Sequence, residues 1–322
     1  MKSKQNNLVK INNNVLKKTD NIITITNKII SEIQQPTEKD FEWWDELDDN
    51  WKKIFNFYIN KPKHEIPLIK AFDDPLKAFD DRFIGGNHYK EPIKIIEENG
   101  ITERPNKTEL KTIINLKFIS IDENKKIKDL KPLLKLKTLN KLKIGSTQLD
   151  NIDSVGEMQE LEYFYLSRNN LKNGIKPINK LKNLKTLYLG LNNIKDLKGL
   201  ENLTKLKTLH LHHNEITDIS SLANLNELNL INLYNNKIED FSPLYNLKNL
   251  KHLSLAQNNI KNVEDFINFK NLESLNISAN NISNIMPLIH IRSLKSLRLG
   301  LNPINEVQKV RLQFAFLNIR IS

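Results

Sequence analysis

The sequence predicts an α/β fold: a right-handed solenoid with short parallel strands on its concave face and 3₁₀ or short helical turns on its convex face. A small helical cap domain is predicted in front of it. The pattern L-x-x-L-x-L-x-x-N recurs at steps of 22 or 23 residues from Leu116 to Asn302. A fixed period of this kind indicates a repeat architecture. All three tryptophans lie upstream, between Trp43 and Trp51, and predict the cap.

The last position of the pattern forms a column of asparagines. An amide both donates and accepts hydrogen bonds, so these side chains can satisfy backbone groups that the turn buries. We therefore expect a structural role for them. The column begins at Asn124, has Thr147 in the second turn, and continues at Asn169, Asn192, Asn214, Asn236, Asn258, Asn280 and Asn302.

The L-x-L core of each repeat alternates, which points its leucines inward and the intervening residues outward on a short strand. Aspartates follow the strand, at Asp196, Asp218 and Asp240, where each can cap a short helical turn. The ten or so remaining residues are too few for a full helix with loops. We therefore expect 3₁₀ turns on the convex face.

Four parts follow one another along the chain. We expect a tail and amphipathic segment at residues 1–35, a helical N-terminal cap domain at 36–110, a solenoid of about nine repeats at 111–302, and a C-terminal cap at 303–322. In the last part, apolar residues from Val307 to Leu317 predict a short helix and Asn318–Ile321 a final strand. Terminal repeats of solenoids are atypical because they shield the open ends of the core.

Apolar residues at three- and four-residue spacing from Trp44 to Tyr58 predict a helix in the N-terminal cap, with Asp40 as its N-cap. Residues 13–35 also fit a helix, although the β-branched run Ile22–Thr26 would suit a strand. Further helical segments are predicted over residues 68–83 and 92–100.

The positive charge is concentrated where the repeats begin. The chain has a formal net charge of +11, and Lys111 to Lys143 holds 10 basic against 3 acidic residues. An acidic cluster lies just upstream, at residues 38–49. The two clusters either neutralise each other when the cap docks on the first repeat, or the basic one attracts an anionic partner.

The repeats resemble the leucine-rich repeat family, in particular its 22-residue class, as in bacterial internalins and the leucine-rich regulatory subunit of protein phosphatase 1. This resemblance covers about two-thirds of the chain. It implies a curved solenoid that binds other molecules, but it names no single partner. The segment Leu16–Phe55 also resembles the front of uncharacterised bacterial leucine-rich repeat proteins, which implies a bacterial origin.

The outward strand positions of the middle repeats carry an unusual number of tyrosines and histidines. Such side chains combine contact area with a polar tip, which suits binding hot spots. Our hypothesis is a non-enzymatic interaction module or scaffold that binds a protein partner on this face; the alternative is a generic polar sheet face. The candidate residues are Tyr163, Tyr165, Arg168, Tyr188, His210, His212, Asn232, Tyr234 and His252.

The second candidate function is nucleic-acid binding by the basic first repeats. Against it, the lysines and the aromatic residues occupy different repeats, whereas binding by stacking and backbone contacts would interleave them. The lysines are Lys125, Lys126, Lys128, Lys131, Lys135, Lys137, Lys141 and Lys143.

Other classes of function have little support in the sequence. His210 and His212 share a face but His252 lies two strands away, so we expect no metal. Phosphate-cradling glycine motifs, a G-x-S-x-G motif, H-E-x-x-H and cysteine are all absent, so we expect neither a cofactor nor an enzyme. No apolar stretch approaches the ~20 residues of a membrane span, and no signal peptide is evident, so we expect a cytoplasmic protein.

Overall fold

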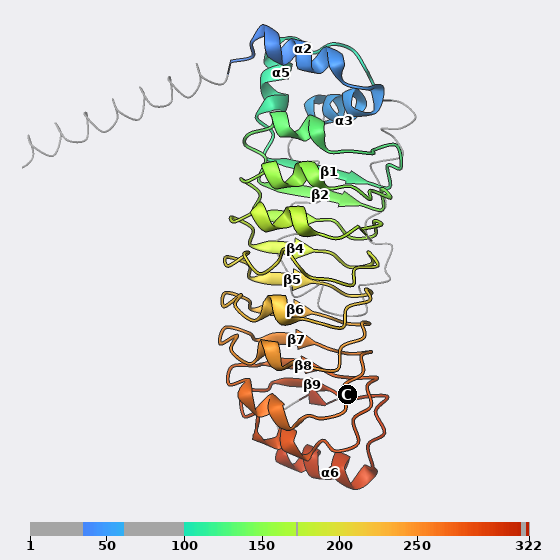
Figure 1. Cartoon of the computed structure of the whole chain (residues 1–322), viewed down its shortest axis with the longest axis vertical. Helices are drawn as coiled ribbons and strands as arrows, with labels where there is room; N and C mark the ends of the chain where they lie inside the picture. Colours follow the sequence, from blue (N-terminus) through green and yellow to red (C-terminus); the bar gives the residue numbers. More distant parts are fainter. Residues whose placement is uncertain (1–34, 61–99, 172, 317–319, 322) are drawn as a thin grey trace, which may run out of the picture.

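The computed structural model describes residues 35–60, 100–171, 173–316 and 320–321. In this part of the chain the repeats stack into one elongated solenoid (Figure 1). Helices α2 (Glu38–Glu46), α3 (Asp49–Asn60) and α5 (Lys107–Ile114) lie at one end, and α6 (Glu306–Ala315) lies at the other. The helices predicted over residues 13–35, 68–83 and 92–100 lie outside the described residues, apart from Gln35 and Gly100.

The tryptophan-rich segment forms two helices where one was predicted. The N-cap of α2 is Thr37, whose backbone N–H donates to the Asp40 carboxylate at 2.6 Å. Asp40 thus lies inside the first turn and closes a capping box, so its prediction as the N-cap was wrong. The carboxylate of Asp48 accepts from the Trp51 amide at 3.0 Å and starts α3. A second capping acid therefore breaks the predicted helix.

Helix α3 joins the cap to the sheet. Trp44, Trp51 and Phe55 are buried, and the rings of Trp51 and Phe55 stack with centroids 5.6 Å apart. Tyr58 is also buried. Its hydroxyl accepts from the Ser120 amide at 2.6 Å and donates to the Ser120 carbonyl at 3.1 Å. It thereby satisfies both backbone groups of Ser120, on the first strand of the sheet.

The strands form one parallel sheet whose order follows the chain. Each strand pairs with the next at the same repeat position, so every repeat adds one strand. The strands are β1 (Phe118–Asp122), β2 (Lys141–Gly145), β3 (Tyr163–Tyr165), β4 (Thr186–Tyr188), β5 (Thr208–His210), β6 (Leu230–Asn232), β7 (His252–Ser254), β8 (Ser274–Asn276), β9 (Ser296–Arg298) and β10 (Arg320–Ile321).

The asparagine column has the structural role that the sequence predicts. The Asn214 side chain donates to the carbonyls of Leu189 and Leu211 at 3.0 and 2.9 Å. Its amide oxygen accepts from the backbone N–H groups of Asn192 and Ile194 at 3.2 and 2.9 Å. One buried side chain thus connects its own repeat to the preceding one.

The convex side consists of short 3₁₀ turns, as predicted. Asp218 accepts from the Ser220 amide and Asp240 from the Ser242 amide, each at 2.8 Å, so these aspartates hold the chain at the start of a turn. The turns are η4 (Lys131–Lys135), η5 (Asp153–Glu157), η6 (Lys176–Lys180), η7 (Ser220–Leu222), η8 (Ser242–Leu244), η9 (Glu264–Asn268) and η10 (Met286–His290).

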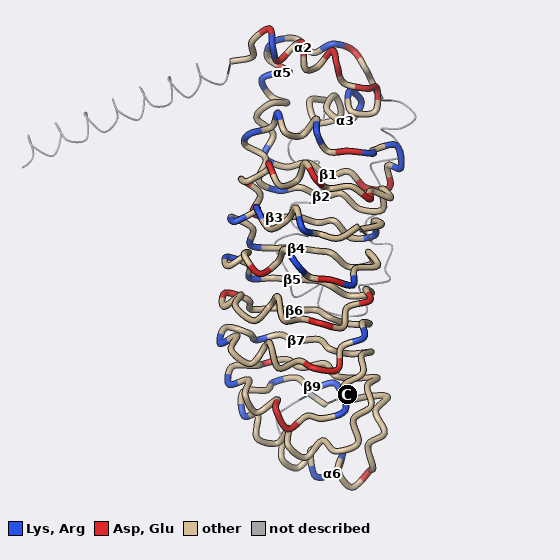
Figure 2. The backbone as a smooth tube through the Cα atoms, viewed as in Figure 1, with Lys and Arg blue, Asp and Glu red and all other residues tan. Residues whose placement is uncertain are grey.

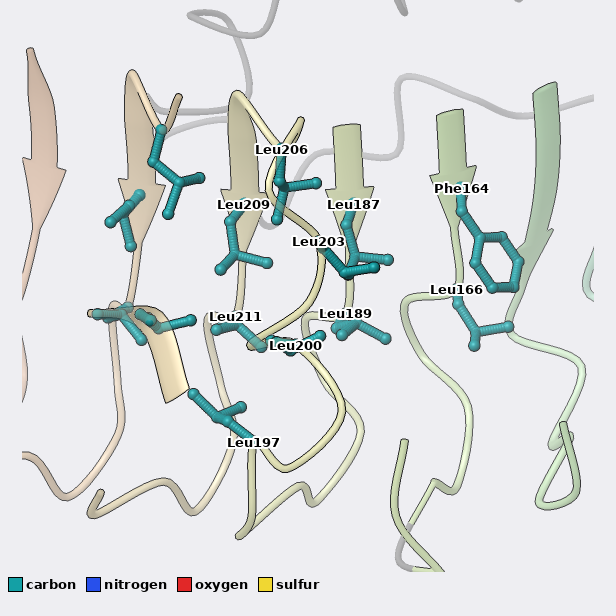
Figure 3. Close-up of a cluster of buried hydrophobic side chains, with 14 of the residues drawn as sticks. Phe164, Leu166, Leu187, Leu189, Leu197, Leu200, Leu203, Leu206, Leu209 and Leu211 are labelled. Carbon is teal, nitrogen blue, oxygen red and sulfur yellow. The ribbon is translucent and has the colours of Figure 1, made fainter. Parts of the chain in front are cut away.

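Leucines from the strands and from the convex side meet in one continuous core. In Figure 3, Leu187 and Leu209 extend from neighbouring strands into the core, which Leu200 and Leu203 on the returning segment and Leu206 before β5 also fill. All five have no exposed surface. Because the inward positions are filled, only the outward strand positions can reach a partner on the concave face.

The C-terminal cap contains the predicted helix and strand. Leu312 and Phe316 of this region are buried, and β10 pairs with β9. Three apolar residues of α6, Val307, Val310 and Phe314, are exposed, although their spacing suggested a buried face. The helix therefore covers the end of the core with one narrow side only.

Candidate functional site

The outward strand positions of the middle repeats form straight rows. Register pairs Tyr165 with Tyr188, Tyr188 with His210, and His210 with Asn232, so four of the predicted site residues form one row across β3–β6. We call this the central row; Ser254 continues it on β7.

Aromatic rings in and beside the central row pack on one another. The rings of Tyr188 and His210 are parallel within 3°, with centroids 4.3 Å apart. Tyr165 and Tyr163 each lie beside Tyr188, at 5.4 and 5.6 Å. The rings therefore stack along the sheet, and the ring of Tyr188 covers one face of the His210 ring.

The structure divides the predicted site into buried and accessible residues. Tyr163, Tyr188, His210 and Asn232 are buried, with exposed fractions of 6%, 6%, 0% and 0%. The expectation that the tyrosines and histidines of this face are exposed was therefore wrong for Tyr163, Tyr188 and His210. Ring stacking contributes to the burial of the rings, and the Asn232 amide oxygen accepts from the backbone N–H of Tyr234 at 3.0 Å. Tyr165, His212, Tyr234 and His252 are half-buried and Arg168 is exposed.

Several buried polar atoms of the central row have no hydrogen-bond partner in the described part of the chain. They are both ring nitrogens of His210, the Asn232 amide nitrogen and the Ser254 hydroxyl. Leaving a buried polar group unsatisfied costs about 1–3 kcal/mol, and native proteins contain few such groups. The row is thus more polar than the packing of the solenoid requires.

The histidines of this face are uncharged at neutral pH. Burial lowers the pKa of His210 well below its ordinary value, and the nearby His212 adds to this effect. Burial, followed by the charges of His213 and Arg168, lowers the pKa of His212 to about 4. The pKa of His213 is also lowered, by burial and by Arg168. Neutral imidazoles offer one donor and one acceptor each.

A second row, next to the central row, contains residues that the sequence analysis did not select. Ser167, Gly190 and His212 follow one another in it at the ends of the strands. A Cβ placed on Gly190 would overlap the His212 ring, so the missing side chain makes room for that ring to lean toward Ser167. The only feature of the sequence that could have indicated this row is Gly190, which lies between Ser167 and His212 at the same repeat position.

Arg168 and His213 flank this second row. Both occupy the left-handed turn at the end of the strand, with φ of 60° and 53°. The Nδ1 atom of His213 lies 2.5 Å from the amide nitrogen of Asn235. Because that nitrogen can only donate, Nδ1 accepts, and Nε2 of the neutral ring carries the proton. Ser167, Arg168, His212 and His213 together form what we call the strand-end corner.

The basic first repeats do not form one patch. Lys135 binds Asp40 of α2 at 2.5 Å, and buried Lys143 pairs with Asp122. The acidic and basic clusters thus neutralise each other in part where the cap docks. The exposed lysines, Lys125, Lys126, Lys128, Lys131 and Lys137, lie in loops and on the convex turn η4. Figure 2 likewise shows blue segments at several edges of the solenoid.

No three His, Asp or Glu side chains in the described ranges are placed to hold a metal ion together. Among the helices described, none combines the length and the apolar character that crossing a membrane requires.

Comparison with known proteins identifies the repeats. A family profile described as leucine-rich repeats in two copies matches residues 159–202, 204–246 and 248–290. The chain therefore contains leucine-rich repeats over these residues. No curated protein matches it by sequence.

Solved leucine-rich repeat structures resemble this one in fold. An internalin from Listeria monocytogenes is 29% identical with a TM-score of 0.60, and the match covers 67% of this chain and 66% of that one. A leucine-rich repeat protein from Leptospira interrogans is 27% identical with a TM-score of 0.60, covering 67% and 56%. The ectodomain of a plant receptor kinase from Arabidopsis thaliana is 21% identical with a TM-score of 0.54, and the match covers 66% of this chain and 27% of that one. This likeness shows a shared fold alone. This leucine-rich repeat chain thus spans less than two thirds of each of these proteins.

Proposed function

We propose that this leucine-rich repeat protein is a non-enzymatic interaction module that binds a protein partner on the concave face of its middle repeats. The observation that carries the proposal is the set of side chains on β3–β7 and on the residues that directly follow these strands. Five accessible residues, Tyr165, Arg168, His212, Tyr234 and His252, surround a buried polar row on a rigid parallel sheet. Residues held by packing lose little conformational entropy on binding.

The buried residues have a different part in this proposal. Tyr188, His210 and Asn232 support the accessible side chains, because the stacked rings fix where Tyr165 lies. Their replacement by alanine would disturb packing as well as binding. Substitutions that test binding therefore belong at the accessible positions. A scaffold role, a cytoplasmic location and a bacterial origin remain predictions.

The test is affinity purification with identification of captured proteins by mass spectrometry. The wild type is compared with a variant carrying Tyr165→Ala, Tyr234→Ala and His252→Ala. We expect the wild type to capture a partner that this variant loses while it still unfolds cooperatively. The control is Tyr245→Ala, a half-buried tyrosine that follows η8 on the convex side. Undiminished capture by the triple variant would refute the concave assignment.

Nucleic-acid binding is the weaker candidate, because the lysines are divided between faces and some are paired. Binding that neutralises phosphates weakens steeply with salt, by about a thousandfold or more between 50 and 200 mM for six or more contacts. We expect capture of the protein partner to change far less over this range. Loss of capture at 200 mM salt, with binding of duplex DNA at 50 mM, would favour the nucleic-acid candidate instead.

A further inference from the structure

The strand-end corner has the chemistry of a carboxylate site. The Ser167 hydroxyl and the His212 Nδ1 are buried and have no hydrogen-bond partner within the described ranges, and Ser167 is only 2% exposed. Gly190 separates them without a side chain of its own. The neutral His213 ring adds an N–H at Nε2, and Arg168 adds a guanidinium at the exposed rim.

The charge of the surrounding sheet fits an anionic ligand. Strands β1–β9 contain a single carboxylate, Asp122, which pairs with Lys143. Lys141 and Arg298 add positive charge to the same face. The carboxylate that follows the corner in sequence, Glu215, is held by Lys237 at 2.9 Å. An acidic segment lying along β3–β7 therefore meets no uncompensated negative charge from these strands.

We propose that the strand-end corner binds a carboxylate side chain from an acidic, extended segment of the protein partner. This inference rests on the proposed function and specifies the chemistry of that partner. Arg168 provides the charge, since guanidinium groups bind carboxylates through paired N–H donors. Ser167 and His213 provide neutral donors that fix the position of the carboxylate. The two tyrosines nearby, Tyr165 and Tyr234, contact the rest of the segment.

Other repeats place different side chains at the turn position that Arg168 occupies. Arg168 has a φ of 60°, and Gln257 occupies the equivalent position four repeats later with a φ of 52°. Arg168→Gln thus keeps a residue type that this turn already accommodates. Arg298, six strands from β3 on the same face, gives a matched control in Arg298→Gln.

The experiment measures binding of a short blocked peptide of alternating glutamate and serine by calorimetry, with its glutamine counterpart as comparison. We expect the glutamate peptide to bind at least about tenfold more tightly than the glutamine peptide. Arg168→Gln and Ser167→Ala should each weaken that binding, and Arg298→Gln should leave it unchanged. Equal affinity for both peptides, or equal losses in Arg168→Gln and Arg298→Gln, would overturn the proposal.

Partner capture separates this inference from the proposed function. If Arg168→Gln captures the partner as fully as the wild type does, the carboxylate site is wrong and the concave binding surface stands. If no partner is captured and the glutamate peptide still binds through Arg168, the carboxylate site stands and the proposed function is wrong.

Discussion

At the scale of single residues, the asparagine column holds the repeats together. Its asparagines replace hydrogen bonds that the turns remove from the backbone; Asn214, for example, binds two carbonyls and two backbone N–H groups. A threonine also fits this position of the repeat when the asparagine of the next repeat accepts a hydrogen bond from its hydroxyl. Thr147 donates to the Asn169 amide oxygen at 2.7 Å.

Replacement of Asn214 by alanine should destabilise the protein by roughly 3 kcal/mol, because it leaves several buried backbone groups without partners. Urea unfolding monitored by circular dichroism measures this loss. Asn224→Ala is the control, since Asn224 is exposed, and it should change the free energy of unfolding by less than about 0.5 kcal/mol. Equal effects of the two substitutions would contradict the structural role of the column.

The histidines of the concave face predict how stability depends on pH. The folded pKa of His212 is about 4, below the ordinary value of about 6.5, so the unfolded chain binds more protons between these values. Protonation of His212 therefore does not lower the free energy of unfolding above pH 6.5. Below pH 6.5 it lowers this free energy progressively as the pH drops toward 4. At pH 5, His212 should account for a loss of about 2 kcal/mol. Unfolding at pH 7 and 5 should show a smaller difference for His212→Gln; the same difference in both proteins would disprove the assignment.

The rows on the concave face follow from the two-residue period of a strand, so Tyr165, Tyr188 and His210 could be placed in one row from sequence. Their burial could not, because it depends on how the rings of neighbouring repeats stack and on what else packs nearby. Ser167 and Gly190 were missed for a related reason. Their importance comes from the lean of the His212 ring over the glycine, and no periodic pattern encodes a side-chain direction.

At the scale of elements, the edge of the sheet explains the N-terminal cap. An edge strand presents unpaired N–H and C=O groups, which natural proteins cover. Here Tyr58 of α3 binds both backbone groups of Ser120 on β1. The sequence predicted that this helix caps the solenoid, from its apolar face. It did not reveal the tyrosine hydroxyl as the contact, nor the break at Asp48, because several acids nearby could start a helix.

Removal of that hydroxyl in Tyr58→Phe should cost about 1–3 kcal/mol, because the Ser120 amide and carbonyl stay buried without partners. Hydrogen exchange at the Ser120 amide should become faster, whereas amides of β7 should exchange as in the wild type. Unchanged exchange at Ser120 would show that another group satisfies this strand.

At the scale of the whole molecule, each repeat contributes the same inward leucines and a different outward set. The solenoid could therefore be predicted from the sequence, since it depends on the repeated positions, whereas the division of the cap into α2 and α3 could not. In the proposed function, binding depends on the positions that do not repeat, such as Tyr165 on β3 and His252 on β7. A rigid array of this kind presents fixed side chains to a partner without a large change in shape.

Hydroxyl-radical footprinting of the captured complex tests this account most directly, because it reports which side chains the partner covers. We predict that oxidation of Tyr165, Tyr234 and His252 falls when the partner binds, while that of Tyr245 on the convex side is unchanged. Protection of Tyr245 with no change at Tyr165 and Tyr234 would contradict the proposal that the concave face of the middle repeats is the binding surface.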